Sequence, residues 1–155
     1  MKKRLLLADD DSRVRESLAA ALTSDGYLVL PAKDGQEALN VVSNSEVDLV
    51  LLDLSMPVKG GWDTFERLTT NNPLLPIIII TARPNQLFTA VGAGVGALLE
   101  KPLDIPTLLK TVNALLSEAP EEQLARVAGR RAQFFYRPSV GPESPPSSLH
   151  WGINE

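Results

Sequence analysis

The sequence contains no cysteine and only one histidine, His150. The absence of cysteine excludes disulfides, thiolate catalysis and zinc sites with cysteine ligands, and it is compatible with a reducing compartment. His150 lies alone in a proline-rich tail, which argues against a phosphorelay histidine in this chain. We therefore expect a cytoplasmic protein whose chemistry depends on other side chains.

Long apolar runs are also missing. The basic start MKKR resembles that of a signal peptide, but only Leu5 to Ala8 follow before three aspartates, which is far too short for a secretory core or a membrane span. Positive charge is not in excess, because the net charge is -4, and this argues against a broad nucleic-acid-binding face. At 155 residues we expect one soluble domain with an appendage.

What the sequence does contain is an alternation of short apolar runs and helical patterns. The runs suit strands buried on both faces of a parallel sheet and cover residues 5–8, 27–31, 47–54, 77–80 and 97–99. Segments with helical spacing begin near Ser12, Asp34, Trp62, Asn85 and Asp104. The sequence therefore predicts an α/β fold, a doubly wound five-stranded parallel sheet with five helices, whose functional crevice lies at the carboxyl ends of the strands.

The composition changes near residue 119, which divides the chain into a domain over 1–118 and an extension over 119–155. Residues 121–137 are predicted as one more helix, and the stretch beyond Pro138 is predicted to be disordered. Arginines alternate with aromatic residues in this helix, so it either packs on the domain or binds an acidic partner, nucleic acid or a second copy as a homodimer. No second domain follows, and we expect a stand-alone protein without a DNA-binding domain.

Acidic residues follow two of the predicted strands. Asp9, Asp10 and Asp11 come after the first strand, and Asp53 ends the third. Two unit charges about 4 Å apart cost roughly 4 kcal/mol at an effective dielectric of about 20, and a cation would remove this cost. Oxygen ligands without histidine or cysteine favour a hard ion, and a small carboxylate set favours magnesium over calcium. The alternative is that the three aspartates only begin a helix, the role we assign to Asp11.

Two further polar residues follow the remaining strands. Thr81 ends the fourth apolar run, and Lys101 comes directly after the fifth. Taken singly, they fit a turn residue and a solvated charge. Taken with the acids on adjacent strand ends, the hydroxyl and the ammonium indicate a site for a transferable anion bound through metal.

These motifs resemble those of the receiver domains of two-component response regulators. The stretches LLLADDDSRVRESL, DLVLLDLSMPVKGGWDTFERL, PIIIITA and AGVGALLEKPLD match in order and at similar spacing, and the resemblance covers residues 3 to about 117. It implies a sheet with strand order 2-1-3-4-5. It also implies a phosphoprotein that takes a phosphoryl group from a sensor histidine kinase or phosphotransfer protein and then binds an unknown downstream protein.

The resemblance assigns roles to individual residues. Asp53 is the implied phosphoacceptor, with Mg²⁺ held by Asp9, Asp10, Asp53 and the carbonyl of Ser55. Thr81 and Lys101 would contact the phosphoryl oxygens. Such a protein is not an enzyme towards other substrates, since it catalyses only its own phosphorylation and dephosphorylation.

Some features fit the family less well or suggest other readings. Leu98 stands where family members usually carry tyrosine or phenylalanine, and residues 91–97 are rich in glycine. A nucleotide-binding loop would have to follow a strand, whereas these glycines precede one. A phosphatase of the haloacid dehalogenase type would need an acid where Ser55 stands. The remaining alternative is a receiver-fold scaffold that is never phosphorylated.

Overall fold

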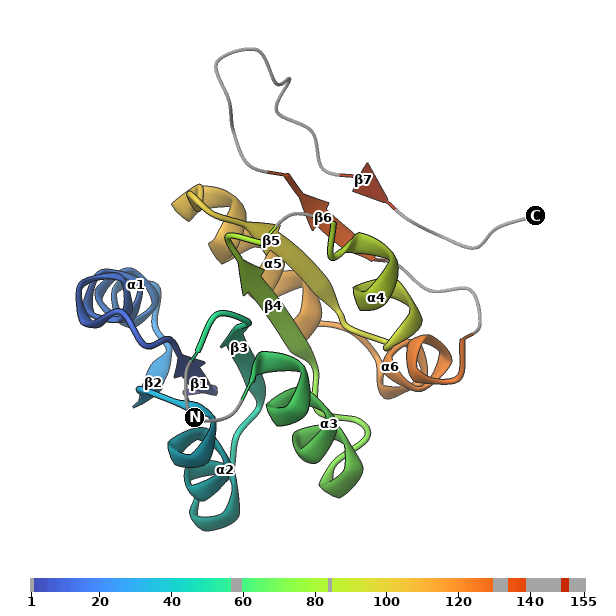
Figure 1. Ribbon diagram of the computed structural model, residues 1–155, viewed down its shortest axis with the longest axis horizontal. Coiled ribbons are helices and arrows are strands. Elements are labelled where there is room, and N and C mark those ends of the chain that lie inside the picture. The colour runs from blue at the N-terminus through green and yellow to red at the C-terminus, as the bar shows by residue number, and fades with distance from the viewer. Residues whose placement is uncertain (1, 57–59, 84, 130–133, 139–148, 151–155) are drawn as a thin grey trace.

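The computed structural model describes residues 2–56, 60–83, 85–129, 134–138 and 149–150. Five parallel strands form the centre of its sheet (Figure 1), namely β1 (Arg4–Ala8), β2 (Leu28–Ala32), β3 (Leu49–Asp53), β4 (Ile77–Thr81) and β5 (Ala97–Glu100). They follow the order β2-β1-β3-β4-β5. The predicted fold class and strand order are therefore confirmed.

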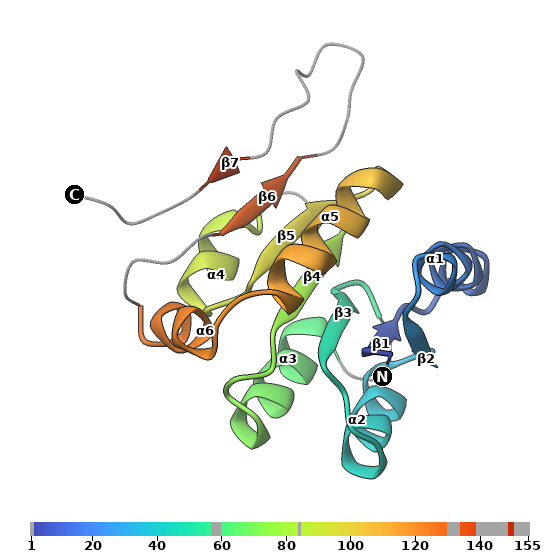
Figure 2. The same cartoon turned by 180° about the vertical axis from the view of Figure 1, so that it is seen from behind.

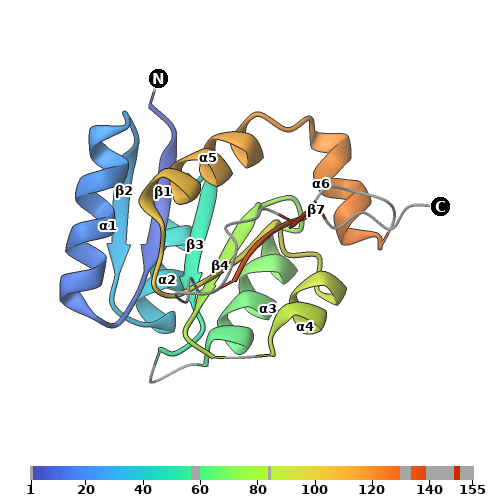
Figure 3. The same ribbon diagram turned by 90° about the horizontal axis from the view of Figure 1, so that it is seen from above.

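Helices cover both faces of this sheet. They are α1 (Ser12–Ser24), α2 (Gly35–Asn44), α3 (Gly61–Asn71), α4 (Leu87–Gly92), α5 (Ile105–Leu116) and α6 (Pro120–Val127). Buried residues of α1 and α5 share one apolar cluster with the sheet, and those of α2, α3 and α4 share the other. Figure 3 shows α3 and α4 on the side opposite α5. No helix in the described part of the chain has the length and hydropathy that a membrane crossing would require.

Three aspartates begin helices that follow strands. The side chain of Asp11 accepts hydrogen bonds from the backbone N–H groups of Arg13 and Val14 and so caps α1, while Asp34 caps α2 and Asp104 caps α5. A carboxylate at this position satisfies backbone donors that the helix cannot. Each of these three helices therefore starts a few residues after the strand that precedes it.

The extension after α5 differs from its prediction. The structure ends α6 at Val127, and the second half of the predicted helix contains a strand instead, β6 (Phe135–Arg137), which pairs in parallel with β5. Its register places Phe135 beside Ala97 and Tyr136 beside Leu98. Phe134 and Tyr136 pack on one face of the sheet and Phe135 on the other. This alternation is the arrangement of a strand. The helix α6 ends earlier, at Val127, and Gly129 two residues later has a φ of 74°, outside the helical range.

The sheet gains a seventh strand from the segment predicted to be disordered. Leu149–His150 forms β7, which pairs antiparallel with β6, so that prediction is wrong for these two residues. Residues 139–148 and 151–155 of the same prediction lie outside the described residues. Figures 1 and 2 show β6 alongside β5 and β7 on its outer side.

Candidate functional site

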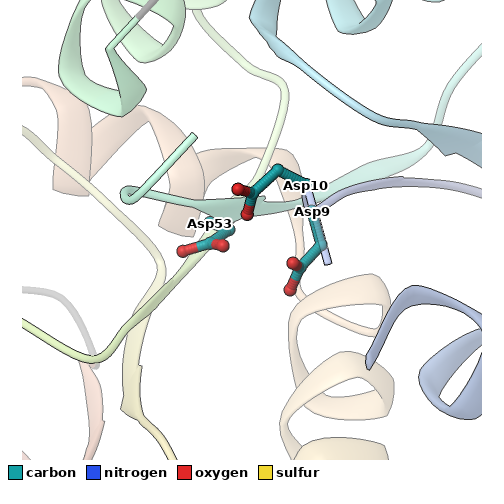
Figure 4. Close-up of side chains that lie close together, drawn as sticks. All are labelled: Asp9, Asp10 and Asp53. Carbon is teal, nitrogen blue, oxygen red and sulfur yellow. The ribbon is translucent and has the colours of Figure 1, made fainter. Parts of the chain in front are cut away.

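Three carboxylates lie together at the carboxyl ends of two neighbouring strands. Asp9 follows β1 directly and Asp53 is the last residue of β3, the strand next to β1. Oxygen atoms of Asp9, Asp10 and Asp53 all lie within 4.8 Å of one another. Figure 4 shows the three side chains gathered at this edge of the sheet. Asp9 and Asp53 are buried and Asp10 is exposed, so the cluster opens to solvent on the Asp10 side.

Lys101 connects two of these carboxylates. Its Nζ lies 3.2 Å from Oδ2 of Asp9 and 3.3 Å from Oδ2 of Asp53, and donates a hydrogen bond to each. The lysine is only partly exposed. The ammonium thus offsets part of the negative charge that the fold concentrates here.

Thr81 lies at the same edge as the last residue of β4. In the β3–β4 register Asp53 pairs with Ile80, so the buried Thr81 comes one position further along. Its hydroxyl oxygen accepts a hydrogen bond from the backbone N–H of Arg83 at 2.8 Å. Its carbonyl oxygen accepts another from the backbone N–H of Lys101 at 2.8 Å, which ties the ends of β4 and β5 together.

Ser55 contacts the cluster through its backbone. Its N–H donates to Oδ1 of Asp53 at 3.0 Å, which fixes the orientation of that carboxylate. The Ser55 carbonyl as a metal ligand stays a prediction. Gly61, at the start of α3, approaches the same loop so closely that a Cβ there would lie 2.4 Å from the Cα of Leu54. Glycine is therefore required for α3 to begin where it does.

The electrostatics of the site follow from burial and close contact. Burial raises the pKa of Asp53, and the charge of Asp9 raises it further, against the Ser55 N–H and Lys101, which both lower it. Burial acts to lower the pKa of Lys101, but the charges of Asp53 and Asp9 outweigh it, so this pKa lies above its usual value. Lys101 is consequently a cation at neutral pH, and the carboxylates remain an unfavourable charge cluster that a further cation would stabilise.

The donor set fits a divalent metal. The three clustered side chains offer only carboxylate oxygens, which suit hard ions, and the exposed Asp10 leaves room for water on one side. The geometry is compatible with the magnesium predicted from the sequence. Within the described residues, the set contains no nitrogen or sulfur ligand that would favour a softer metal.

Two residues help to position Asp9: Arg15, which was missed in the sequence, and Asp11, which was assigned only to the helix start. The Arg15 Nη1 donates to the Asp9 carbonyl oxygen at 2.6 Å, and the Asp11 backbone N–H donates to Oδ1 of Asp9 at 3.0 Å. Arg15 lies on the first turn of α1, and its charge carries no signal in the sequence that distinguishes it from a solvated arginine. Arg15 reaches the end of β1 because α1 begins only three residues after Asp9.

Comparison with known proteins agrees with this architecture. The response regulator receiver domain family matches residues 5–113. The response regulator MprA of Mycobacterium sp. (strain KMS) is 39% identical over 125 residues, which is 79% of this chain and 54% of that protein. MprA of Mycolicibacterium vanbaalenii is 39% identical over 118 residues, 75% of this chain and 51% of that protein. The chain thus spans about half the length of these curated relatives.

Solved structures show the same similarity. The non-phosphorylated HemR receiver domain from Leptospira biflexa superimposes with a TM-score of 0.72 at 30% identity, covering 76% of this chain and 97% of that one. The regulator TrrA from Thermotoga maritima, solved in complex with Mg²⁺-BeF, has a TM-score of 0.68 at 28% identity, covering 73% of this chain and 98% of that one. With a site of carboxylates, threonine and lysine at the strand ends, this chain belongs to the response regulator receiver domain family.

Proposed function

We propose that this chain is a phosphoacceptor that receives a phosphoryl group on Asp53 from a histidine kinase or a phosphotransfer protein. The observation that carries the proposal is the position of Asp53. Its carboxylate is buried at the end of β3, lies within 4.8 Å of two other acids and contacts the ammonium of Lys101. A purely structural acid would have no need of this surplus of like charge.

The transfer follows from these contacts. An oxygen of the Asp53 carboxylate attacks the phosphorus of a phosphohistidine, the P–N bond breaks, and the imidazole leaves with the electron pair. Lys101, now held between Asp9 and Asp53, would turn to the phosphoryl oxygens and neutralise their charge. The Thr81 hydroxyl accepts from the Arg83 N–H, so its own O–H would donate to another of these oxygens.

Mg²⁺ is the proposed cofactor. Asp9, Asp10, Asp53 and the Ser55 carbonyl would hold it, and when bound it supplies the charge neutralisation that phosphoryl transfer requires. The Mg²⁺-BeF complex of TrrA supports this choice by similarity. Because Asp10 is exposed, the ion and the phosphodonor would reach the site from its side.

The phosphorylated domain would signal by binding another protein. We place the receiver domain at residues 1–118 and treat 119–155 as an extension whose strand β6 joins the same sheet. The chain would act in the cytoplasm and catalyse only its own phosphorylation and dephosphorylation. A scaffold that is never phosphorylated is the alternative that the experiment must exclude.

The test is labelling with a small acyl phosphate. The full chain is incubated with acetyl phosphate and Mg²⁺, and a mass gain of one phosphoryl group is measured by intact-protein mass spectrometry. We expect labelling of the wild type and none of Asp53→Asn. Asp63→Asn is the matched control, because Asp63 is an exposed carboxylate on α3, outside the acidic cluster, that forms an ion pair with Arg67. A wild type that is labelled neither by acetyl phosphate nor by a phosphorylated histidine kinase would support the alternative of a scaffold that is never phosphorylated.

A further inference from the structure

Two of the three clustered acids, Asp9 and Asp10, share one peptide group, because they are neighbours in the sequence. The carbonyl oxygen of this group belongs to Asp9 and accepts a hydrogen bond from Nη1 of Arg15 at 2.6 Å. On the other side of Asp9, its backbone N–H donates to the carbonyl oxygen of Ala32, at the end of the neighbouring strand β2, at 3.1 Å. The peptide groups before and after Asp9 are therefore both held by contacts from other parts of the chain.

The two carboxylates are restrained to different degrees. Oδ1 of the buried Asp9 accepts a hydrogen bond from the backbone N–H of Asp11, and Oδ2 accepts one from Nζ of Lys101. Asp10 is exposed and lies beside Asp9 in Figure 4. The direction in which its side chain leaves the backbone depends on the peptide group that it shares with Asp9. Through that one group, Arg15 affects the position of both carboxylates.

Arg15 is well suited to fix a peptide group. It is half-buried, and its own backbone N–H donates to the carbonyl oxygen of Asp11 at 2.9 Å, so the helix α1 holds the arginine close to the acids. Its guanidinium is planar and charged, and a hydrogen bond from a charged donor is stronger than one between neutral groups. A lysine would carry the same charge on a flexible stem, without the planar fork. The contact with Asp9 therefore depends on the shape of the arginine as well as on its charge.

Rigid oxygen ligands distinguish Mg²⁺ from Ca²⁺. Mg²⁺ is the smaller ion and requires nearly octahedral oxygen ligands at about 2.0–2.1 Å, whereas Ca²⁺ accepts irregular sets at about 2.3–2.6 Å. When the ligands move more freely, the binding of Mg²⁺ is weakened more than the binding of Ca²⁺. The contact between Arg15 and the carbonyl oxygen of Asp9 therefore favours the smaller ion.

The charge of Arg15 acts in the opposite direction. A guanidinium close to the acidic cluster of Asp9, Asp10 and Asp53 repels any divalent cation, so charge alone predicts tighter binding once Arg15 is removed. Because Mg²⁺ and Ca²⁺ carry the same charge, this repulsion changes the affinity for both by a similar factor and leaves their ratio unchanged. The preference for Mg²⁺ over Ca²⁺ thus separates a positioning role from a purely electrostatic one.

We propose that Arg15 is a positioning residue that makes the acidic cluster select Mg²⁺ over Ca²⁺, by holding the peptide group that joins Asp9 and Asp10. Its role is exerted through two of the proposed ion ligands, and it has no part in the transfer itself. This inference deepens the proposed function and rests on it, because it requires that the cluster holds a divalent ion.

The first test is a titration of the full chain with MgCl₂ and, separately, with CaCl₂, followed by amide chemical shifts in two-dimensional NMR spectra. Residues that hydrogen-bond to metal ligands contribute a factor of about 10–100 to affinity, so Arg15→Met should weaken Mg²⁺ binding by about 10-fold. Its affinity for Ca²⁺ should fall by less than about 3-fold, so that the preference for Mg²⁺ decreases. Arg15→Lys should lose part of the same preference although it keeps the charge.

Arg13→Met is the matched control. Arg13 is an exposed arginine near the start of α1, and the hydrogen bond that it donates to Asp11 comes from its backbone N–H, which methionine keeps. The variant removes the same charge from the same helix, close to Arg15. It should therefore keep the wild-type preference between the two ions. The NMR spectra recorded before the ions are added show whether each variant is folded.

The second test measures labelling with acetyl phosphate over a range of Mg²⁺ concentrations. Arg15→Met should need about 10-fold more Mg²⁺ to reach half of its maximal rate, because Arg15 acts on the binding of the ion. Its rate at saturating Mg²⁺ should stay within about 2-fold of the wild type. A variant whose maximal rate falls while its Mg²⁺ requirement is unchanged would contradict the positioning role.

Two results of the titrations would overturn the inference. One is an affinity for Mg²⁺ that is unchanged or higher in Arg15→Met, and the other is a loss of affinity that is equal for both ions. The proposed function would stand in either case, as long as the wild type is labelled on Asp53. A wild type that binds no Mg²⁺ would reject the inference together with the proposed cofactor, and a wild type that is never labelled would reject the proposed function.

Discussion

The two edges of the core sheet are protected in different ways. β2 is an outer strand with half-exposed residues, and it carries Pro31, which pairs with Leu7 and has no N–H to offer. β5 contains no proline, and Ala97, Leu98 and Leu99 are buried. An uncovered β5 would present apolar residues and unpaired backbone groups together, which is the usual template for unwanted strand pairing.

The β5 edge is therefore covered and the β2 edge is interrupted. Cover comes from β6, a strand of three residues whose neighbour Phe134 is buried in the core. This difference between the edges indicates that the extension after α5 stabilises the domain by covering the β5 edge of its sheet. The other edge needs no such element, because its own sequence limits pairing.

The largest expected effect is a difference in the free energy of unfolding between variants at the two edges. Phe134→Ala should lower the free energy of unfolding by about 3 kcal/mol, because it removes a buried aromatic side chain and leaves a cavity. Leu28→Ala on β2 should cost about 1 kcal/mol or less, since Leu28 is 41% exposed. Urea unfolding of both variants measures the difference. Equal costs would mean that β6 does not stabilise the sheet as described.

The site between the edges should also affect stability. Because burial and Asp9 raise the pKa of Asp53, the ionised carboxylate destabilises the folded state, and Asp53→Asn should stabilise the metal-free protein by about 1 kcal/mol at neutral pH. In the wild type, the protonated Asp53 carboxyl contributes favourably to the free energy of unfolding below the ordinary pKa of 3.8. This stability is lost as the pH rises through the higher pKa of the folded state. Thermal melts across this acid range should show a weaker pH dependence in the variant.

The effect of Mg²⁺ on stability should also differ between the wild type and Asp53→Asn. Millimolar Mg²⁺ should raise the melting temperature of the wild type by mass action on the folded state, and should do so much less for Asp53→Asn, which has lost a ligand. A wild type indifferent to Mg²⁺, together with a variant no more stable than its parent, would contradict the view that these carboxylates share one ion.

At alkaline pH, the stability of the protein should depend on Tyr136, which lies on β6 at the covered edge of the sheet. Burial and the Glu100 carboxylate raise the pKa of Tyr136 above 10.0, so the unfolded chain loses this proton first and the folded state loses stability as pH rises through the folded value. Tyr136→Phe should cost about 1 kcal/mol at pH about 8, through the lost hydrogen bond, and should reduce the loss at higher pH. Urea unfolding at pH about 8 and at a pH above the pKa of Tyr136 tests this. If the free energy of unfolding depends on pH in the same way in Tyr136→Phe and the wild type, the Glu100 carboxylate does not affect the ionisation of Tyr136.

The smallest expected effect on stability concerns the β2 edge. Pro31→Val should change the free energy of unfolding by less than about 1 kcal/mol, because Pro31 is exposed and valine suits a strand. The variant should nevertheless self-associate more readily, since β2 gains a backbone donor on an open edge. Light scattering over a range of protein concentrations measures this. A variant as monodisperse as the wild type would show that the proline is not what protects this edge.

Much of the fold could be predicted from local sequence. The runs at 5–8, 47–54 and 77–80 are apolar on every residue or nearly so, and short runs of this kind suit strands buried on both faces of a parallel sheet. Asp34 and Asp104 are recognisable as helix starts because a cap needs only its own neighbours. The β6 strand escaped prediction because three residues are too few to show a period, and Leu124, Val127 and Phe134 together resemble a helical stripe.

By itself, the sequence determined the alternation of strands and helices and the order of polar residues at the strand ends, since both depend on residues close in the chain. The tertiary structure decided which of these residues meet. Lys101 reaches Asp9 and Asp53 across 92 and 48 positions, and Tyr136 reaches Glu100 across 36. Contacts of this range depend on sheet order and register, and no local pattern encodes them. The same is true of the β5 edge, whose need for a cover is visible only once the strands are side by side.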